Sequence, residues 1–134
     1  VSLNLAPAMA VPGALLARAS LLCVNETEAA FYGDALHASG ALVAISLGGE
    51  GAALHRHGKE IARASSPKVQ VVDTVGAGDT FTAALTVALI EGMTEQDALR
   101  FAVTAGALAC TRAGAQPSLP KRAEVDALVA KTWP

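Results

Sequence analysis

The feature that most constrains the fold is a change of hydrophobic period near residue 73. Before it, apolar residues form short runs of strand length, such as 20–24 and 41–47, bounded by polar residues or glycines. Such runs are typical of strands that are buried on both faces. After it, residues 79–91 and 94–112 repeat at helical spacing and are apolar nearly all round, which is typical of buried helices. Strands separated by helices predict an α/β fold with a largely parallel sheet.

The same patterns predict the remaining elements. Pro12 in the first-turn position predicts a short helix over 12–19, and residues 121–131 predict an amphipathic closing helix. Gly92 is expected to end the first of the two apolar helices, and Thr94 to cap the second. The other predicted elements are strands over 1–5 and 69–72 and a hairpin over 51–65, with its turn near His57.

Composition and charge exclude several classes of function. Hydrophobic residues make up 52% of the 134 residues and charged residues 16%, which favours a sizeable buried core. The net charge is −2 and there is no basic run, so a nucleic-acid partner is not expected. No basic-apolar leader and no apolar run of membrane-spanning length occurs, so no membrane partner is expected and a cytoplasmic location is favoured.

The cysteines and histidines give no metal signal. Cys23 and Cys110 lie far apart without CxxC or Cys/His spacing, which favours two reduced core thiols. His55 and His57 would point the same way on a strand. With no third ligand apparent, exposed hairpin positions are favoured over a metal site.

The segment VVDTVGAGDTF (71–81) carries the strongest chemical signal. At a junction of strand and helix, Gly76-Ala77-Gly78 lets the backbone approach a ligand, and the first N–H groups of the helix suit an anion, above all phosphate. Asp79 beside such a site suits a group that deprotonates or orients a hydroxyl next to a phosphoryl group in transfer. A tight turn with an acid in the first helical turn would have the same sequence, and the tetrapeptide alone leaves both interpretations open. There is no GxxxxGK[ST], so a P-loop is excluded.

This segment resembles the second signature of the ribokinase family, the phosphofructokinase-B-type carbohydrate kinases. Four further segments are similar to segments of that family, in the family's order. NLAPA (4–8) resembles NPAPA, with leucine in place of the first proline, and VNETEA (24–29) resembles N-E-T-E. ISLGGEGA (45–52) resembles V-T-L-G-x-x-G-A, and TRAGAQPSLP (111–120) is most similar to the ribokinase branch. The resemblance runs over nearly all of the chain and implies a ribokinase-like three-layer α/β/α fold.

The resemblance also implies a reaction. It is the ATP-dependent phosphorylation of the primary hydroxyl of a sugar, with D-ribose as the expected substrate. Asp79 would be the catalytic base, and the N–H groups of Gly76, Ala77 and Gly78 would form an anion hole for the γ-phosphoryl group. The alternatives are another sugar or nucleoside kinase of the same family, or a non-catalytic nucleotide-binding fragment.

Magnesium and nucleotide sites are implied in the first half of the chain. By resemblance, Asn25 and Glu28 would act around Mg²⁺ and its waters, in keeping with the preference of this ion for oxygen ligands. Taken alone, the same pair fits a helix cap that closes a capping box. The remaining implied nucleotide contacts are Ser46, Gly48 and Gly51 along the phosphates and ribose, and Val103 in the adenine pocket, where family members often carry asparagine.

The resemblance further implies a monovalent cation, K⁺, beside the anion hole. Its implied ligands are Asp73, the carbonyl oxygens of Val75, Ala109, Arg112 and Gly114, and Ser118. Several carbonyl oxygens with one carboxylate suit a large, singly charged ion, which would fix the 73–79 loop and preorganise the anion hole. Without the family, Asp73 is typical of an aspartate that caps a turn.

Two departures from the family pattern bear on domain organisation. Everything that the family places before NPAPA is absent, including the substrate lid, so we expect residues 1–134 to be the C-terminal, nucleotide-binding part of a ribokinase-like domain. The stretch 33–41 is also shorter than the family's helical connection, which an internal deletion or missing residues would explain equally. Because dimers of this family often form through the lid, a homodimer is expected only for a full-length protein.

Overall fold

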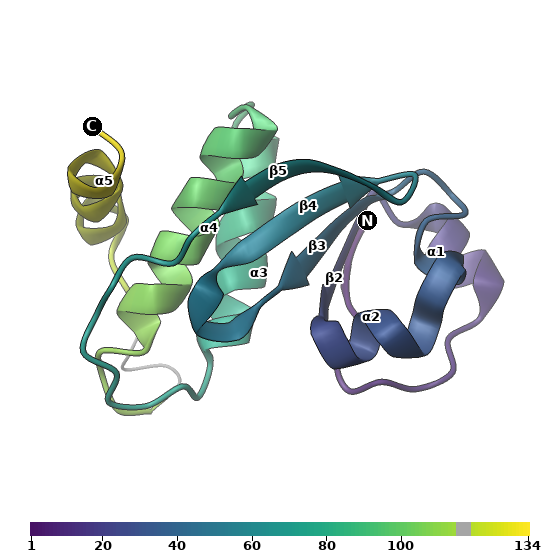
Figure 1. Cartoon of the computed structure of the whole chain (residues 1–134), viewed down its shortest axis with the longest axis horizontal. Helices are drawn as coiled ribbons and strands as arrows, with labels where there is room; N and C mark the ends of the chain where they lie inside the picture. Colours follow the sequence, from purple (N-terminus) through teal and green to yellow (C-terminus); the bar gives the residue numbers. More distant parts are fainter. Residues whose placement is uncertain (115–118) are drawn as a thin grey trace. The chain divides into compact units, whose positions relative to one another are not determined.

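All five strands lie in the first part of the chain, with short helices between them, and the three long helices lie in the second, as the change of period predicts (Figure 1). The structure is a computed structural model that describes residues 1–114 and 119–134. It divides into two units, Val1–Arg63 and Ala64–Pro134. The five-stranded sheet, with its short helices, and the later long helices confirm the predicted α/β class.

The first unit contains the sheet and its connecting helices. Its strands are β1 (Ser2–Asn4), β2 (Leu21–Asn25), β3 (Leu42–Ser46), β4 (Ala52–Arg56) and β5 (Lys59–Ala64), the last of which ends at the boundary between the units. Its helices are α1 (Gly13–Arg18) and α2 (Glu26–Tyr32), with the short 3-10 helices η1 (Gly33–Leu36) and η2 (Gly48–Glu50).

The strands lie in the order β1-β2-β3-β4-β5. The first three are parallel, with Leu22 opposite Val43 in the register of β2 and β3. β4 is antiparallel to β3 and is joined to β5 by His57 and Gly58, which both have positive φ. Two such residues are typical of the tight turn of a hairpin. The predicted hairpin is therefore confirmed, and the sheet is parallel only over β1–β3.

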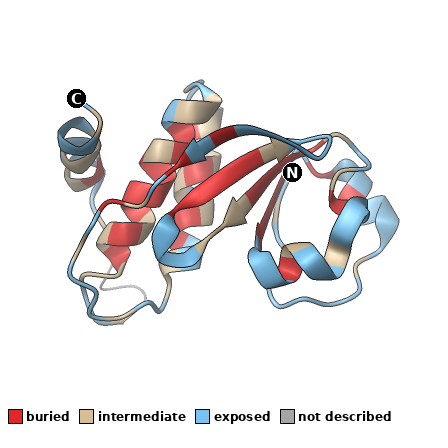
Figure 2. Cartoon of the chain, in the orientation of Figure 1, coloured by how far each residue is buried: buried red, intermediate tan, exposed pale blue. Residues whose placement is uncertain are grey.

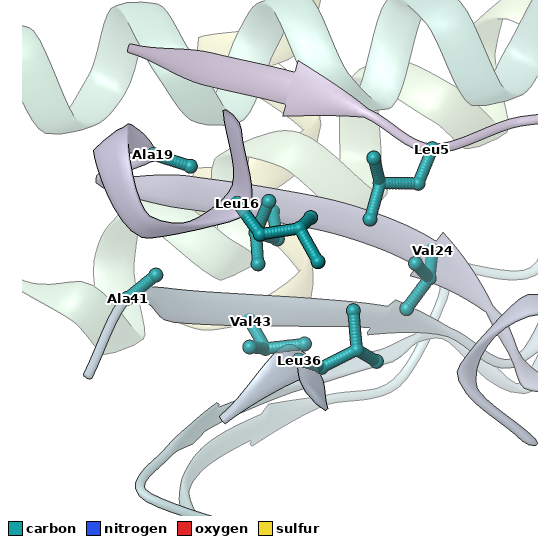
Figure 3. Close-up of a cluster of buried hydrophobic side chains, with 8 residues drawn as sticks. Leu5, Leu16, Ala19, Val24, Leu36, Ala41 and Val43 are labelled. Carbon is teal, nitrogen blue, oxygen red and sulfur yellow. The ribbon is translucent and has the colours of Figure 1, made fainter. Parts of the chain in front are cut away.

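One face of this sheet packs on the core of the first unit (Figure 3). Leu22 and Val24 lie two residues apart on β2. They therefore point to the same side of the sheet, which is also the side of Val43 of β3. Leu16 of α1 and Leu36 of η1 pack against them. The neighbouring positions of β2 and β3 on the other face are buried as well (Figure 2). The expectation of strands buried on both faces is thus confirmed for β2 and for most of β3.

The second unit is a set of three helices, α3 (Ala77–Ile90), α4 (Glu95–Ala109) and α5 (Arg122–Thr132). α3 and α4 lie side by side (Figure 1). Gly92, with φ of 84°, follows the end of α3, and the hydroxyl of Thr94 accepts the N–H of Asp97 at 3.2 Å at the start of α4. Both predicted helix boundaries are confirmed.

Two expectations about burial and pairing are wrong. α4 is buried along most of its length, as predicted (Figure 2). α3, in contrast, exposes Val87 (45%) and Ile90 (80%). No strand forms over 69–72. Instead Val71 and Val72 are exposed, and the N–H of Val72 donates to the carbonyl oxygen of Cys110 at 2.7 Å. The segment is therefore tied to the end of a helix and not to a neighbouring strand.

Candidate functional site

The carboxyl ends of β2 and β3 bring together two of the predicted site residues of the first unit. Asn25 ends β2 and stands opposite Ser46, which ends β3. The Ser46 hydroxyl donates a long hydrogen bond of 3.4 Å to the carbonyl oxygen of Val24. Because parallel strands direct their carboxyl ends to one edge of the sheet, Asn25 and Ser46 lie where ligands bind in open α/β folds.

Asn25 and Glu28 form a complete capping box at the start of α2. The Asn25 side-chain oxygen accepts the N–H of Glu28 at 2.8 Å, and Oε2 of Glu28 accepts the N–H of Asn25 at 2.9 Å. Glu28 is buried, with 6% of its surface exposed. The capping interpretation is therefore confirmed. It uses only one oxygen of the Glu28 carboxylate, so the oxygen ligands that Mg²⁺ prefers remain present in this pair.

The turn after β3 is built by glycine backbone geometry. Gly48 has φ of 60° and Gly51 has φ of 112°, values that other residues rarely adopt. The N–H of Leu47 donates to the carbonyl oxygen of Gly51 at 2.8 Å and closes the turn. A Cβ added at Gly48 would meet nothing within 4 Å, so the backbone there is open to close approach by a ligand.

In the second unit, the GAGD segment forms the first turn of α3. Gly76 caps the helix in the left-handed conformation, with φ of 80°. Its carbonyl oxygen accepts two bonds from Thr80, one from the N–H and one from the hydroxyl, each of 2.9 Å. The N–H of Ala77 donates back to Thr74 at 3.2 Å. By helix geometry, the N–H groups of Gly78 and Asp79 have no intrahelical acceptor.

Asp79 lies in this first turn as an exposed acid. Its carboxylate makes no hydrogen bond to any residue that the structure describes. Negative charge at this position is favourable to the helix dipole. The tight turn with an acid is therefore present, and so is the open amide turn that an anion site requires.

The side chain of Asp73 joins the segment before α3 to the segment after α4. Oδ1 accepts the N–H of Val75 at 3.0 Å, and Oδ2 accepts the N–H of Gly114 at 3.1 Å. These two N–H groups, that of Val75 above all, hold the pKa of the Asp73 carboxyl below its ordinary value. The carboxylate is an oxygen ligand of the kind that a monovalent cation needs, but the groups that contact it are the N–H groups of Val75 and Gly114 and not their carbonyl oxygens. The turn-capping interpretation of Asp73 is also confirmed.

Two further predicted cation ligands, Ala109 and Arg112, lie at or just after the end of α4. Ala109 is its last residue and is buried, whereas the Arg112 side chain forms an ion pair with Glu124 of α5. Ser118 lies outside the described residues. Val103, predicted to lie in an adenine pocket, is 5% exposed within α4.

Sequence reasoning missed two contributions to this region. Thr80 holds the carbonyl of Gly76, and the carbonyl oxygen of Cys110 accepts the N–H groups of both Val72 and Asp73, at 2.7 and 3.1 Å. A threonine four residues after Gly76 is a local signal that could have been used. The Cys110 contact joins residues far apart in the sequence and left no local signal.

Cys23 and His57 lie as predicted, whereas Cys110 and His55 do not. Neither cysteine forms a disulfide; Cys23 is buried and Cys110 is only partly buried. Burial, and secondarily the charge of Asp73, raises the pKa of the Cys110 thiol. His57 is exposed in the hairpin turn, while His55 is half-buried at intermediate exposure. No group of three metal-ligating side chains occurs in residues 1–114 and 119–134. No helix over the same residues is long and apolar enough to cross a membrane.

The fold and the residues at its strand and helix ends show to which class of protein the chain belongs. It is an α/β protein with polar residues at its strand ends and an open amide turn beside an exposed acid. The sequence matches the profile of pfkB family carbohydrate kinases over residues 3–122, and the chain belongs to that family. The resemblance recognised in the sequence is confirmed.

Individual relatives agree with this assignment. A ribokinase of Bacillus subtilis is 40% identical over 135 residues, which cover 96% of this chain and 46% of that protein. A ribokinase of Arabidopsis thaliana is 49% identical over 84 residues, covering 62% and 22%. The solved structure of Arabidopsis thaliana ribokinase complexed with ribose and ATP is 38% identical, with a TM-score of 0.87, covering 96% of this chain and 47% of that one. Almost all of this chain matches the Bacillus subtilis ribokinase and the solved structure, but it spans only about half the length of each.

Proposed function

We propose that the protein carrying this chain transfers the γ-phosphoryl group of ATP to the primary hydroxyl of a sugar, and that the sugar is D-ribose. The observation that carries the proposal is the exposed carboxylate of Asp79 in the first turn of α3, directly after the open amide of Gly78. Support for the substrates comes from the Arabidopsis thaliana ribokinase structure, which is described as complexed with ribose and ATP.

In this proposal Asp79 is the general base. It accepts the hydroxyl proton as the sugar oxygen forms its bond to the γ-phosphorus, while the bond to the β–γ bridging oxygen breaks and ADP leaves. The N–H groups of Gly76, Ala77 and Gly78 are the proposed anion hole, where fixed donors offset the charge of the transition state. The Ala77 N–H would exchange its bond with Thr74 for one with the phosphoryl group.

Residues of the first unit are proposed to hold the nucleotide and Mg²⁺. Asn25 and the second carboxylate oxygen of Glu28 would bind waters of the ion, and Ser46, Gly48 and Gly51 would line the phosphates and ribose. Val103 is the proposed adenine contact of the second unit. When bound, Mg²⁺ would supply positive charge that offsets the charge developing on the phosphates.

A site for K⁺ is proposed around the Asp73 carboxylate. The pKa of Asp73 lies below its ordinary value, so the group carries a negative charge at neutral pH, and its hydrogen bonds bring the backbone of Val75 and that of Gly114, 41 residues further on, beside it. The carbonyl oxygens of Val75, Ala109, Arg112 and Gly114, with Ser118, would complete the ligand set. The chemistry that such an ion supplies is a fixed positive charge beside the anion hole.

The test is Asp79→Asn in the protein at its natural length, with ADP release measured with D-ribose in the presence and absence of K⁺. We expect the variant to lose about 10²–10⁴-fold in kcat, the range for loss of a general base, with ATP affinity nearly unchanged. Asp97→Asn is the matched control, because Asp97 occupies the same position in the first turn of α4.

The two variants separate the two interpretations of Asp79. If Asp79→Asn and Asp97→Asn both retain wild-type turnover, Asp79 only complements the helix dipole and the proposed role is refuted. ATP binding without ribose-dependent ADP release in the wild type would favour a non-catalytic nucleotide-binding protein. Faster turnover with another sugar or a nucleoside would replace D-ribose as the substrate.

A further inference from the structure

We propose that Thr80 is a positioning residue for the phosphoryl-transfer step, an inference that rests on the function proposed above. Thr80 follows Asp79 directly and is buried, with 6% of its surface exposed. Its hydroxyl donates to the carbonyl oxygen of Gly76 at 2.9 Å, and its own N–H donates to the same oxygen at 2.9 Å. Gly76, the N-cap residue of α3, is therefore held by two donors of Thr80, its side-chain hydroxyl and its backbone N–H.

The importance of this contact follows from the planarity of the peptide bond. The carbonyl of Gly76 and the N–H of Ala77 belong to one rigid plane. Thr80 holds one side of that plane, and the carbonyl oxygen of Thr74 accepts from the other at 3.2 Å. The orientation of this plane fixes the direction of the Ala77 N–H, one donor of the proposed anion hole, and the chain leads from it directly to the next donor, the N–H of Gly78.

Gly76 needs such a restraint more than another residue would. Its left-handed conformation, with φ of 80°, suits glycine, but glycine also has access to many other conformations. A turn that binds an anion through backbone amides is useful only when those amides are already oriented. The Thr80 hydroxyl supplies an additional restraint where the backbone is intrinsically least restricted.

The hydroxyl bond can be removed without leaving a buried polar group unpaired. In Thr80→Val, the carbonyl oxygen of Gly76 keeps the bond from the N–H of residue 80, and valine has nearly the shape of threonine. Thr80→Ser keeps the hydroxyl and loses only a methyl group. Thr86→Val is the matched control, because the Thr86 hydroxyl donates in the same way to the carbonyl oxygen of Thr82, at 2.8 Å, further along α3.

The first measurement is steady-state kinetics of ribose-dependent ADP release for the wild type and these three variants at natural length. We expect Thr80→Val to lower kcat about tenfold while KM for ATP changes by less than about twofold, the pattern of an interaction that matters in the transition state. Thr80→Ser and Thr86→Val are expected to stay near wild type. Equal kcat in Thr80→Val and the wild type would overturn the proposal, as would an equal loss in Thr86→Val.

The second measurement does not depend on turnover. Inorganic phosphate is titrated into wild type, Thr80→Ser and Thr80→Val, and the amide signals of Ala77 and Gly78 are followed by NMR. We expect phosphate to shift these amide signals in the wild type and in Thr80→Ser, and to shift them less in Thr80→Val. The same response in all three would overturn the role of Thr80. A wild type without kinase activity would instead refute the proposed function, and the titration would still decide whether Thr80 orients the amides.

Discussion

The capping box of α2 gives a prediction that separates structural from functional roles of Asn25 and Glu28. Asn25→Ala removes the oxygen that accepts the N–H of Glu28 at 2.8 Å. Loss of an N-cap acceptor costs about 1 kcal/mol, and the variant should unfold about 5 °C below the wild type for a domain of this size. Glu28→Gln should stay within about 0.5 kcal/mol, because glutamine can close the same box through its amide oxygen.

The stability assay is thermal and urea unfolding followed by far-UV circular dichroism. Thr94→Ala is the matched control, since Thr94 caps α4 through one bond of 3.2 Å to the N–H of Asp97. It should lose a similar free energy of unfolding. A loss below about 0.3 kcal/mol in Asn25→Ala would refute the reasoning, because the bond would then contribute nothing beyond what water offers the same N–H.

The functional half of this prediction uses variants that preserve the cap. Asn25→Ser keeps a good N-cap oxygen but shortens the side chain, and Glu28→Gln removes the charge. If the pair acts around Mg²⁺, both variants should need more Mg²⁺ for half-maximal ADP release at nearly unchanged stability. Thr94→Ala should lose stability with no change in the Mg²⁺ requirement. An unaltered Mg²⁺ requirement in both cap-preserving variants would leave Asn25 and Glu28 as a helix cap alone.

Two further predictions concern the second unit. Because the pKa of Asp73 is lowered in the folded state, its hydrogen bonds to Val75 and Gly114 stabilise the fold fully above the unfolded-state pKa of about 3.9, and this stabilisation is lost as pH falls through the lower pKa of the folded state. An NMR titration should show the amide signals of Val75 and Gly114 shifting only at that lower pH. The variant Asp73→Asn should abolish this transition. Leu85→Ala, at a fully buried position of α3, should lower the free energy of unfolding in urea by about 3 kcal/mol. Val87→Ala, at a position that is 45% exposed, should lower it by less than about 1 kcal/mol. Equal losses in the two variants would contradict an exposed face of α3.

Most elements were predictable because hydrophobic period is a local property. β2 and β3 followed from short apolar runs, and α4 from a long one. The exposed residues of α3 were not predictable in this way. The apolar pattern of Val87 and Ile90 indicates that these side chains could be buried, but it does not say that the 134 residues contain anything to cover them.

The site was predictable to the extent that its contacts are short in sequence. Asn25 and Glu28 are three residues apart, so the capping box could be named from the sequence as one of two interpretations. The sequence predicts Asp73 as a turn aspartate, and its bond to the N–H of Val75, two residues further on, is local. Its second bond, to Gly114, spans 41 residues and depends on how α3 and α4 pack, which no local pattern contains.

The wrong strand over 69–72 shows how this limit bears on the candidate active site. A run rich in valine has the propensity of a strand, but a strand also needs a neighbour that accepts its N–H groups. Here the N–H groups of Val72 and Asp73 both donate to one carbonyl oxygen, that of Cys110, just after α4. The chain that leads into Gly76 is therefore positioned by the end of a helix more than thirty residues later. The position of the amide turn in the GAGD segment therefore depends on where α4 ends. Substitutions near Cys110 should disturb this turn although they lie far from it in the sequence.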